Sequence, residues 1–281
     1  MKYYIVDAFT SEPFGGNPAG VVLLDTDFPA DRLMQQVAAE LRYSETAFVR
    51  RDGTAEFTVR YFTPAGEVDL CGHATIASFG LLLREGSVAR GDLCMNHTLA
   101  GDLCIKVGEP VMMQMAPPRV LELPLDTNRL HHIMAGGARQ HWLDSPVEVV
   151  STGLPDIIMP VASVDALNAL SPDMDALDRM SRELDVVGVH AFALGDDGFT
   201  AHVRNFAPRY NIPEESATGT ANAALTHYLM RRSLVQQGDD CRFMQGEVLG
   251  RPSVVATRVD GEDRVWVGGY SCIVAQGELL V

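Results

Sequence analysis

The sequence predicts an α+β fold of two pseudo-symmetric lobes, each a curled, mostly antiparallel β-sheet or barrel around one central buried helix. Three observations predict this fold. Short strands follow one another closely along most of the chain, two helices are apolar on nearly all sides, and an internal repeat spans about half of the 281 residues.

Segments rich in β-branched and aromatic residues, separated by Gly, Pro and Asp, indicate the strands. Their close spacing favours antiparallel, curled sheets. The predicted strands are residues 3–9, 20–24, 46–51, 57–62, 103–107, 111–116, 147–151, 157–161, 187–194, 199–205, 253–259 and 264–274.

Five helices are predicted, and they are of two kinds. Residues 31–41, 165–170 and 174–184 have apolar residues at helical spacing on one face, as surface helices do. Residues 72–85 and 219–232 are small or apolar nearly all round, with charge only at the C-terminal end. This pattern is typical of a helix buried in a core.

The two apolar helices lie in a repeated sequence context. Their first glycines, Gly72 and Gly219, are 147 positions apart. That period indicates a duplicated domain and not a short-period solenoid. The matching segments are Arg60-Tyr61, Pro64 and Cys71-Gly72-His73-Ala74 in the first copy, and Arg209-Tyr210, Pro213 and Thr218-Gly219-Thr220-Ala221 in the second.

The repeat predicts the domain boundaries. We expect an N-terminal lobe of residues 1–118, completed by a C-terminal strand at about 270–281, and a C-terminal lobe of residues 119–269. The Pro-containing stretch 116–125 reads as a strand-poor linker between them.

Charge and hydropathy exclude several classes of partner. The 22 Lys and Arg against 37 Asp and Glu give a net charge of −15, with no basic cluster, which argues against nucleic-acid and anionic-membrane binding. No apolar run approaches the roughly 18 residues of a membrane span. The N-terminus reads as a strand interrupted by Asp7 and not as a signal peptide, so a cytoplasmic protein is expected.

Metal and cofactor motifs are absent from the sequence. The five cysteines are odd in number, scattered and never in a CxxC pair, which argues against a disulfide framework or a zinc site. His131-His132 is an adjacent pair without an acid-rich ligand cluster, and no GxxxxGK[ST] or GxGxxG loop is present. We therefore expect no metal and no organic cofactor.

The starts of the two apolar helices are candidate anion sites. A helix that begins with Gly offers unpaired backbone N–H groups and the positive end of the helix dipole. Gly72 and Gly219 are therefore candidate ligands for a small anionic metabolite with a carboxylate group. Alternatively, each glycine only forms a tight turn before its helix.

Four nearby side chains carry possible chemistry, and for three of them a structural alternative is given. Glu45 is a candidate proton shuttle or a solvated loop acid. His73 is a candidate hydrogen-bonding group for a substrate or a satisfied core histidine. Glu215 is a candidate substrate-binding residue or an ordinary capping residue at the start of the second helix. Cys71 lies at the first helix start, where a thiol becomes more reactive.

Motifs along nearly the whole chain resemble those of a known family. They are VDAFT at 6–10, GNPA at 16–19, SETAF at 44–48, YFTP at 61–64, EVDLCGHAT at 67–75, STGL at 151–154, EESATGTA at 214–221, QG at 245–246 and GRPS at 250–253. In this order they resemble the PhzF-like phenazine-biosynthesis isomerases. The resemblance implies the fold of diaminopimelate epimerase, with an active site between the two lobes.

The resemblance also implies residue roles. Glu45 of the SETAF motif corresponds to the acid/base of a cofactor-independent isomerase, and His73, Glu215 and Thr220 correspond to its substrate-binding residues. This chain departs from the family pattern EDPATGSA, because Glu215 replaces Asp, Ser216 replaces Pro and Thr220 replaces Ser. The longer acid and the extra methyl group are expected to reshape the substrate site. The family further implies a homodimer.

Two other functions are compatible with the sequence. The first is an amino-acid epimerase or racemase of the same fold, which needs one cysteine at each helix start. Here Cys71 is matched by Thr218, whose hydroxyl is far too weak an acid or base to replace a thiolate, so Cys71 is expected to be a packing residue. The second is a non-catalytic metabolite-binding protein.

Overall fold

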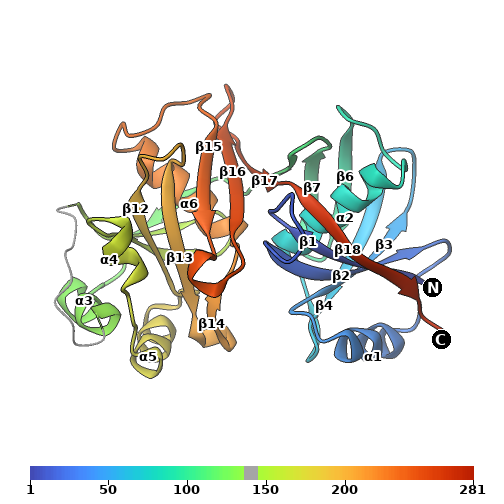
Figure 1. The fold of residues 1–281 in the computed structure, drawn as a ribbon, viewed down its shortest axis with the longest axis horizontal. Coiled ribbons are helices and arrows are strands. Elements are labelled where there is room, and N and C mark those ends of the chain that lie inside the picture. The colour runs from blue at the N-terminus through green and yellow to red at the C-terminus, as the bar shows by residue number, and fades with distance from the viewer. Residues whose placement is uncertain (136–144) are drawn as a thin grey trace. The chain divides into compact units, whose positions relative to one another are not determined.

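The structure is a computed structural model that describes residues 1–135 and 145–281 (Figure 1). The chain divides into two compact units, one of residues 1–114 with 268–281 and the other of residues 115–267. In each unit, mostly antiparallel strands surround a helix that is buried along most of its length. The predicted α+β fold class is confirmed. No helix within the described residues is long and apolar enough to cross a membrane.

The first unit contains the two ends of the chain. Its helices are α1 (Asp31–Leu41) and α2 (Gly72–Arg84). Its strands are β1 (Lys2–Ala8), β2 (Asn17–Leu24), β3 (Thr46–Arg51), β4 (Glu56–Phe62), β5 (Glu67–Val68), β6 (Leu93–Thr98), β7 (Gly101–Lys106), β8 (Val111–Gln114) and β18 (Ser271–Glu278). Strand β1 pairs antiparallel with β2 on one side and with β18 on the other, so the last strand of the chain completes the first unit (Figure 1).

Helix α2 is the centre of the first unit. It packs against β1, β2, β3, β8 and β18, and its residues from His73 to Leu82 are all buried. The two hydroxyl groups in this stretch are satisfied within the helix, because Thr75 Oγ1 donates to the Cys71 carbonyl at 2.7 Å and Ser78 Oγ to the Ala74 carbonyl at 2.7 Å. These two hydroxyl groups therefore have hydrogen-bond partners although the helix is buried in an apolar core.

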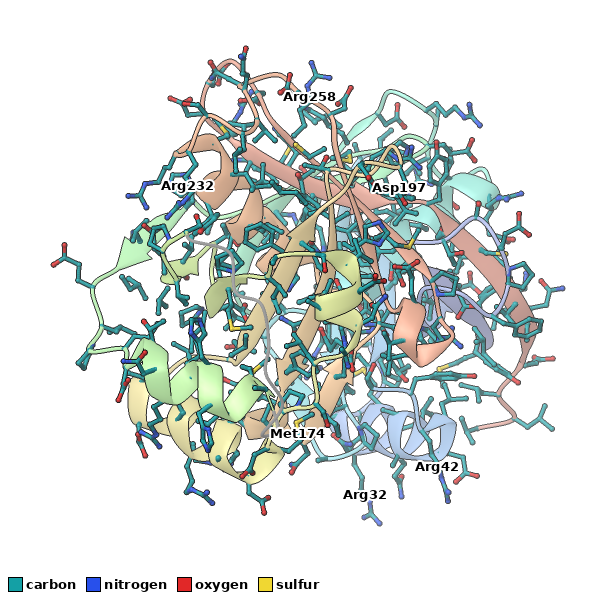
Figure 2. All side chains as sticks on the ribbon, turned by 60° about the vertical axis from the view of Figure 1, so that its left-hand side comes forward. Arg32, Arg42, Met174, Asp197, Arg232 and Arg258 are labelled. Carbon is teal, nitrogen blue, oxygen red and sulfur yellow. The ribbon has the colours of Figure 1, made fainter. Side chains whose placement is uncertain are left out.

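Helix α1 covers one face of the same unit. Its buried residues are Met34, Val37 and Ala38, which follow the spacing of one helix face. Arg32 and Arg42 point away from the body of the unit (Figure 2). The observed bounds equal the predicted ones because this helix has a clear apolar face.

The second unit has the same plan with additional helices. Its helices are α3 (Thr127–Ala135), α4 (Val164–Asn168), α5 (Met174–Leu184) and α6 (Gly219–Met230), with short 3₁₀ turns at Pro208–Tyr210 and Glu247–Leu249. Its strands are β9 (Arg119–Leu121), β10 (Glu148–Ser151), β11 (Pro155–Pro160), β12 (Val189–Leu194), β13 (Ala201–Ala207), β14 (Ile212–Glu215), β15 (Cys241–Gln245) and β16 (Ser253–Val259). Strand β17 (Val265–Gly269) crosses the boundary between the two units.

Strand pairing confirms the internal repeat. The series β1–β2–β3–β4–β6–β7 and the series β10–β11–β12–β13–β15–β16 pair in the same order, with parallel pairs only at β2–β3 and β4–β6 in the first and at β11–β12 and β13–β15 in the second. Helix α6 packs against β10, β11 and β16 and occupies in its unit the position that α2 occupies in the other. The two buried helices are thus equivalent elements.

The stretch 116–125, expected to be a strand-poor linker, contains one short strand. Strand β9 lies within it and pairs antiparallel with β10. Arg119 and Val120 are exposed, so this strand lacks the alternation of buried and exposed residues that identifies a strand in sequence. A short exposed strand of this kind therefore cannot be recognised from the alternation of apolar and polar residues in the sequence.

Three further predictions need correction. The strand predicted at 264–274 is interrupted at Tyr270, whose carbonyl accepts the Thr10 N–H at 3.2 Å, so that β17 and β18 are separate. Helix α3 was not expected, although Leu130, Ile133 and Met134 form its buried face. Five strands were not predicted, namely β5, β6, β9, β14 and β15.

Candidate functional site

Helix α2 begins at the first candidate anion site. Cys71 is its N-cap residue, in an extended conformation, and the Cys71 side chain makes no capping hydrogen bond. The first N–H groups of a helix have no partner within the helix. A side chain at Gly72 would make only an ordinary contact, 3.7 Å from Met113 Cε. Packing therefore does not require glycine at position 72, where the residue is half-buried.

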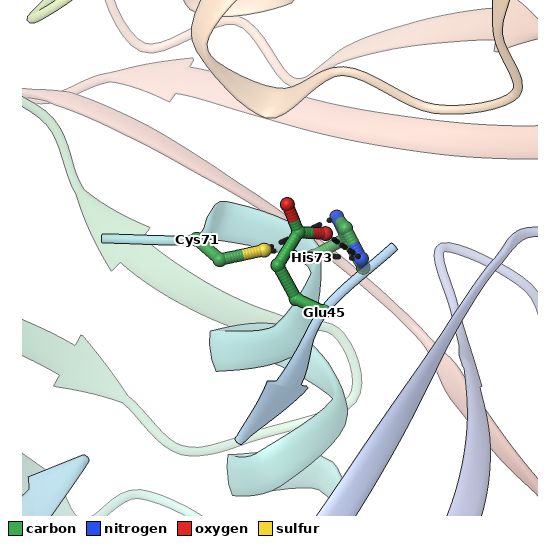
Figure 3. Close-up of side chains that lie close together, drawn as sticks. All are labelled: Glu45, Cys71 and His73. Carbon is green, nitrogen blue, oxygen red and sulfur yellow. Dashed lines mark hydrogen bonds and ion pairs between the residues drawn. The ribbon is translucent and has the colours of Figure 1, made fainter. Parts of the chain in front are cut away.

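Glu45 and His73 form an acid/imidazole pair beside this helix start (Figure 3). Glu45 directly precedes β3, and its carbonyl accepts the Gly20 N–H at 3.1 Å, which holds it at the end of the parallel β2–β3 pair. Glu45 Oε2 lies 3.2 Å from His73 Nε2, with side chains 17% and 7% exposed. Ser44 Oγ lies 3.3 Å from the same nitrogen. The Glu45 carboxylate is therefore mostly buried and is not a solvated loop acid, which was the alternative interpretation.

A thiol also lies against the imidazole, close to both of its nitrogen atoms. Cys71 Sγ lies 3.3 Å from His73 Nδ1 and 3.8 Å from Nε2. Cys71 was expected to be a packing residue. It is buried, but its position as N-cap directs the sulfur over the first turn of α2 and against the imidazole (Figure 3).

His73 is neutral in this arrangement. Burial lowers the pKa of His73, and the negative charge of Glu45 opposes this effect without reversing it. A neutral imidazole has one donor and one acceptor nitrogen. Its Nε2 lies 3.3 Å from the Ser44 hydroxyl and 3.2 Å from Glu45 Oε2, and Glu45 Oε2 accepts no hydrogen bond from the described residues. The neutral ring of His73 therefore lies beside the carboxylate without forming an ion pair with it.

In the second unit, polar side chains organise the start of α6. Glu215 Oε2 accepts the hydroxyl of Thr218 at 2.7 Å. Gln245 Oε1 accepts the Thr218 N–H and the Asn222 side-chain amide, each at 3.0 Å. Gln245 Nε2 donates to the Glu215 carbonyl at 2.9 Å and to Thr218 Oγ1 at 3.0 Å. The helix start at Gly219 is thus held by one buried glutamine.

Gln245 was not identified as a site residue from the sequence, although the QG motif at 245–246 marks its position. Gly246 has φ +81°, and a Cβ there would lie 2.3 Å from the Arg251 carbonyl oxygen and 2.7 Å from the Ser216 carbonyl oxygen. Only glycine fits, because any side chain would displace backbone. This turn brings the Gln245 side chain to the start of α6. Thr220 is half-buried, and its carbonyl accepts the Thr152 hydroxyl at 2.9 Å.

A series of buried polar side chains in contact with one another extends from α6 into the sheet of the second unit. Asn222 Oδ1 lies 3.3 Å from His190 Nε2, Asn205 Nδ2 lies 3.3 Å from His190 Nδ1, and the same amide donates to Asp156 Oδ1 at 3.5 Å. Burial raises the pKa of Asp156 to about 7, with a further contribution from the charge of Glu215. Burial lowers the pKa of His190 to about 4. Asp156 was not identified from the sequence, although an acid inside an apolar strand marks it.

The structure brings the predicted site residues together in two groups. Glu45, Gly72 and His73 lie around the start of α2 in the first unit. Glu215, Gly219 and Thr220 lie around the start of α6 in the second unit. The adjacent pair His131-His132 lies in α3, where consecutive side chains point about 100° apart. Among the described residues, the group with metal-ligand spacing is Glu45, Cys71 and His73.

Comparison with known proteins identifies the family. Residues 6–277 match the PhzC-PhzF family, described as phenazine biosynthesis-like protein. This chain belongs to that family. An uncharacterised isomerase of Deinococcus radiodurans is 34% identical over 292 residues, which cover 98% of this chain and 94% of the relative. The PhzF-family protein of Bacillus anthracis has a similar crystal structure, with a TM-score of 0.89 and 26% identity, and the match covers 100% of this chain and 99% of that protein.

A relative with a specific name also matches over the whole length. The trans-2,3-dihydro-3-hydroxyanthranilate isomerase of Pseudomonas chlororaphis is 29% identical over 293 residues, which cover 99% of each chain. Together these relatives show that this PhzF-family chain is an isomerase.

Proposed function

We propose that this PhzF-family chain catalyses proton transfer on a small carboxylate metabolite, without metal or organic cofactor, with Glu45 as the acid/base. The observation that carries the proposal is the burial of Glu45 Oε2 at 3.2 Å from His73 Nε2, beside the start of α2. A carboxylate held next to a neutral imidazole is suited to accept a proton from a carbon atom and to return it to another atom.

The remaining residues have supporting roles in this proposal. A carbon acid is weak, so the developing enolate-like charge must be stabilised, and the N–H groups at Gly72 supply fixed dipoles for this purpose. His73 orients Glu45. Glu215, Gly219 and Thr220 bind the polar groups of the substrate.

We propose a substrate that differs from that of the Pseudomonas chlororaphis relative. Glu215 has one methylene more than the Asp of the family pattern, and Thr220 has one methyl group more than Ser. Both changes reduce the room for a substrate, so a smaller carboxylate is favoured. We further propose that the protein acts as a homodimer, which light scattering after size-exclusion chromatography measures.

The exchange of solvent deuterium into trans-2,3-dihydro-3-hydroxyanthranilate and a panel of small carboxylates tests the proposal. Glu45→Gln keeps the size of the side chain but removes its basicity, so the exchange and turnover rates are expected to fall about 10²- to 10⁴-fold. Glu40→Gln changes an exposed acid on α1 and is expected to keep the wild-type rate. Wild-type rates in Glu45→Gln would contradict the role of Glu45.

The epimerase alternative has its own test. The residue that matches Cys71 is Thr218, and its hydroxyl donates to Glu215, so the second unit offers no thiol at the start of α6. Cys71→Ser is therefore expected to retain a substantial part of the turnover rate. If this variant folds normally but loses nearly all activity, thiol catalysis replaces the Glu45 mechanism.

A further inference from the structure

The group formed by Glu45, Cys71 and His73 offers three different ligand atoms at one place (Figure 3). A carboxylate oxygen, a thiol sulfur and an imidazole nitrogen lie within 4.8 Å of one another. His73 Nε2 is 3.8 Å from Cys71 Sγ and 3.2 Å from Glu45 Oε2. These three side chains come from the end of the β2–β3 pair and from the first turn of α2.

The spacing agrees with tetrahedral coordination of zinc. Zinc binds sulfur at about 2.3 Å and nitrogen or oxygen at about 2.0–2.2 Å. Tetrahedral angles then separate a nitrogen ligand from a sulfur ligand by roughly 3.5 Å and from an oxygen ligand by roughly 3.3 Å. The two distances from His73 Nε2 lie within a few tenths of an ångström of these values. Because Cys71 Sγ lies nearer to Nδ1 than to Nε2, the Cys71 side chain must rotate toward Nε2 for all three atoms to bind one ion.

The chemistry of the three groups also favours a metal ion. Glu45 Oε2 is buried and accepts no hydrogen bond from the described residues, so it keeps its lone pairs for another ligand. His73 is buried beside these groups and offers a ring nitrogen, which binds a metal ion in the neutral form of the imidazole. Cys71 is the N-cap of a 13-residue helix, whose dipole favours the thiolate.

The donor set selects one class of ion. One sulfur, one nitrogen and one oxygen suit Zn²⁺ and disfavour Mg²⁺ and Ca²⁺, which prefer oxygen ligands. Two anionic ligands neutralise the two charges of the ion. The net charge of −15 adds a general attraction for cations.

We propose that Glu45, Cys71 and His73 form a Zn²⁺ site, and that Zn²⁺ bound there inhibits the isomerase. Three protein ligands leave a fourth position for water. Inhibition follows because the ion occupies the carboxylate and the imidazole that proton transfer requires. The inhibition rests on the proposed function, whereas the binding of the metal does not.

Binding is tested on the full-length protein with Co²⁺ as a spectroscopic probe and Zn²⁺ by calorimetry. We expect one equivalent of Co²⁺ to produce a thiolate-to-cobalt charge-transfer band, which Zn²⁺ abolishes by displacement. Cys71→Ser should lose this band and weaken Zn²⁺ binding about 100-fold or more, since even the loss of an outer partner of a metal ligand costs 10- to 100-fold. Glu45→Gln should keep the band but bind Zn²⁺ more weakly.

Cys104→Ser provides the matched control, because Cys104 is a half-buried thiol in β7 of the same unit. This variant should keep both the band and the affinity. Circular dichroism verifies the fold of each variant. Absence of the band in the wild-type protein, or its loss in Cys104→Ser with its retention in Cys71→Ser, would overturn the proposed site.

Inhibition is measured in the deuterium-exchange assay, with each variant compared with its own metal-free rate. Zn²⁺ should inhibit the wild-type protein, EDTA should reverse the inhibition, and Cys71→Ser should require about 100-fold more Zn²⁺. Activation by Zn²⁺ would overturn the inhibitory role. The Glu45→Gln exchange rates in metal-free buffer test the proposed function separately, so each proposal can fail without the other.

Discussion

Asp156 is a buried carboxyl group in the sheet of the second unit, and its protonation couples stability to pH. Its pKa is about 7 in the folded protein, against an ordinary value of 3.8. The folded state therefore retains a proton that the unfolded state loses between about pH 4 and pH 7, so this group lowers stability as pH rises. His190, with a pKa of about 4 against 6.5, has the opposite effect between about pH 4 and 6.5.

Asp156 and His190 change the stability in opposite directions as pH rises, so their contributions partly cancel in the wild-type protein. A variant that cannot ionise at position 156 therefore isolates the contribution of Asp156. Asp156→Asn keeps an oxygen acceptor for Asn205 but cannot ionise. The stability of the wild-type protein relative to this variant should fall by roughly 4 kcal/mol from pH 4 to above pH 7, at 1.36 kcal/mol per pKa unit. Urea unfolding between pH 4 and 8 measures it, with the exposed Asp165→Asn as control. A constant difference between wild type and Asp156→Asn would contradict the buried titration.

At the scale of elements, helix α2 contacts β18 through a glycine. A Cβ at Gly80 would lie 1.9 Å from Ser271 Oγ and 2.9 Å from Ser271 Cβ. The hydroxyl can rotate away, but the Cβ can move only with the backbone of β18. The closeness of this buried helix to the strand thus depends on the absence of one side chain.

Gly80→Ala is therefore expected to destabilise the protein by about 1–3 kcal/mol, although alanine favours helix. Adding Ser271→Gly removes the clash, so the double variant should lose less stability than the sum of the single variants. Gly72→Ala, in the same helix, places its Cβ 3.7 Å from Met113 Cε and should be nearly neutral. Thermal unfolding of the four variants measures these effects, and additive losses would argue against direct contact.

At the scale of the whole molecule, the chain returns to its first unit at its end. Strand β18 pairs with β1 from Ser271 opposite Ala8 to Glu278 opposite Lys2, and it also packs against α2. Without β18, β1 would become an open edge and one side of α2 would be uncovered. The first unit is thus completed only when the chain has reached residue 278.

Removal of residues 271–281 is therefore expected to unfold the first unit. Hydrogen exchange should show that the amides of residues 2–8 and of α2 lose protection, and the protein should aggregate through the open edge. A chain that lacks only Leu280 and Val281, which are 91% and 71% exposed, should exchange like wild type. Wild-type protection in the longer deletion would show that β18 is dispensable.

Several features of this protein were determined by local sequence. The helices at 72 and 219 were predictable because their all-round apolar character is readable within a dozen residues, and the repeat was predictable because both copies kept their glycines. Glu45 and His73 were identified through motifs. Each of these signals lies within one short segment, where periodicity and residue type directly reflect burial.

Other features were decided only by tertiary structure. The contact of Cys71 with His73 depends on the geometry of a helix start, and the support of α6 by Gln245 joins residues that are 27 positions apart. The pKa of Asp156 depends on burial by several elements at once. Residues 119–121 form strand β9 because they pair with β10. Such properties arise from strand register and close packing between distant segments, which no local pattern of residues encodes.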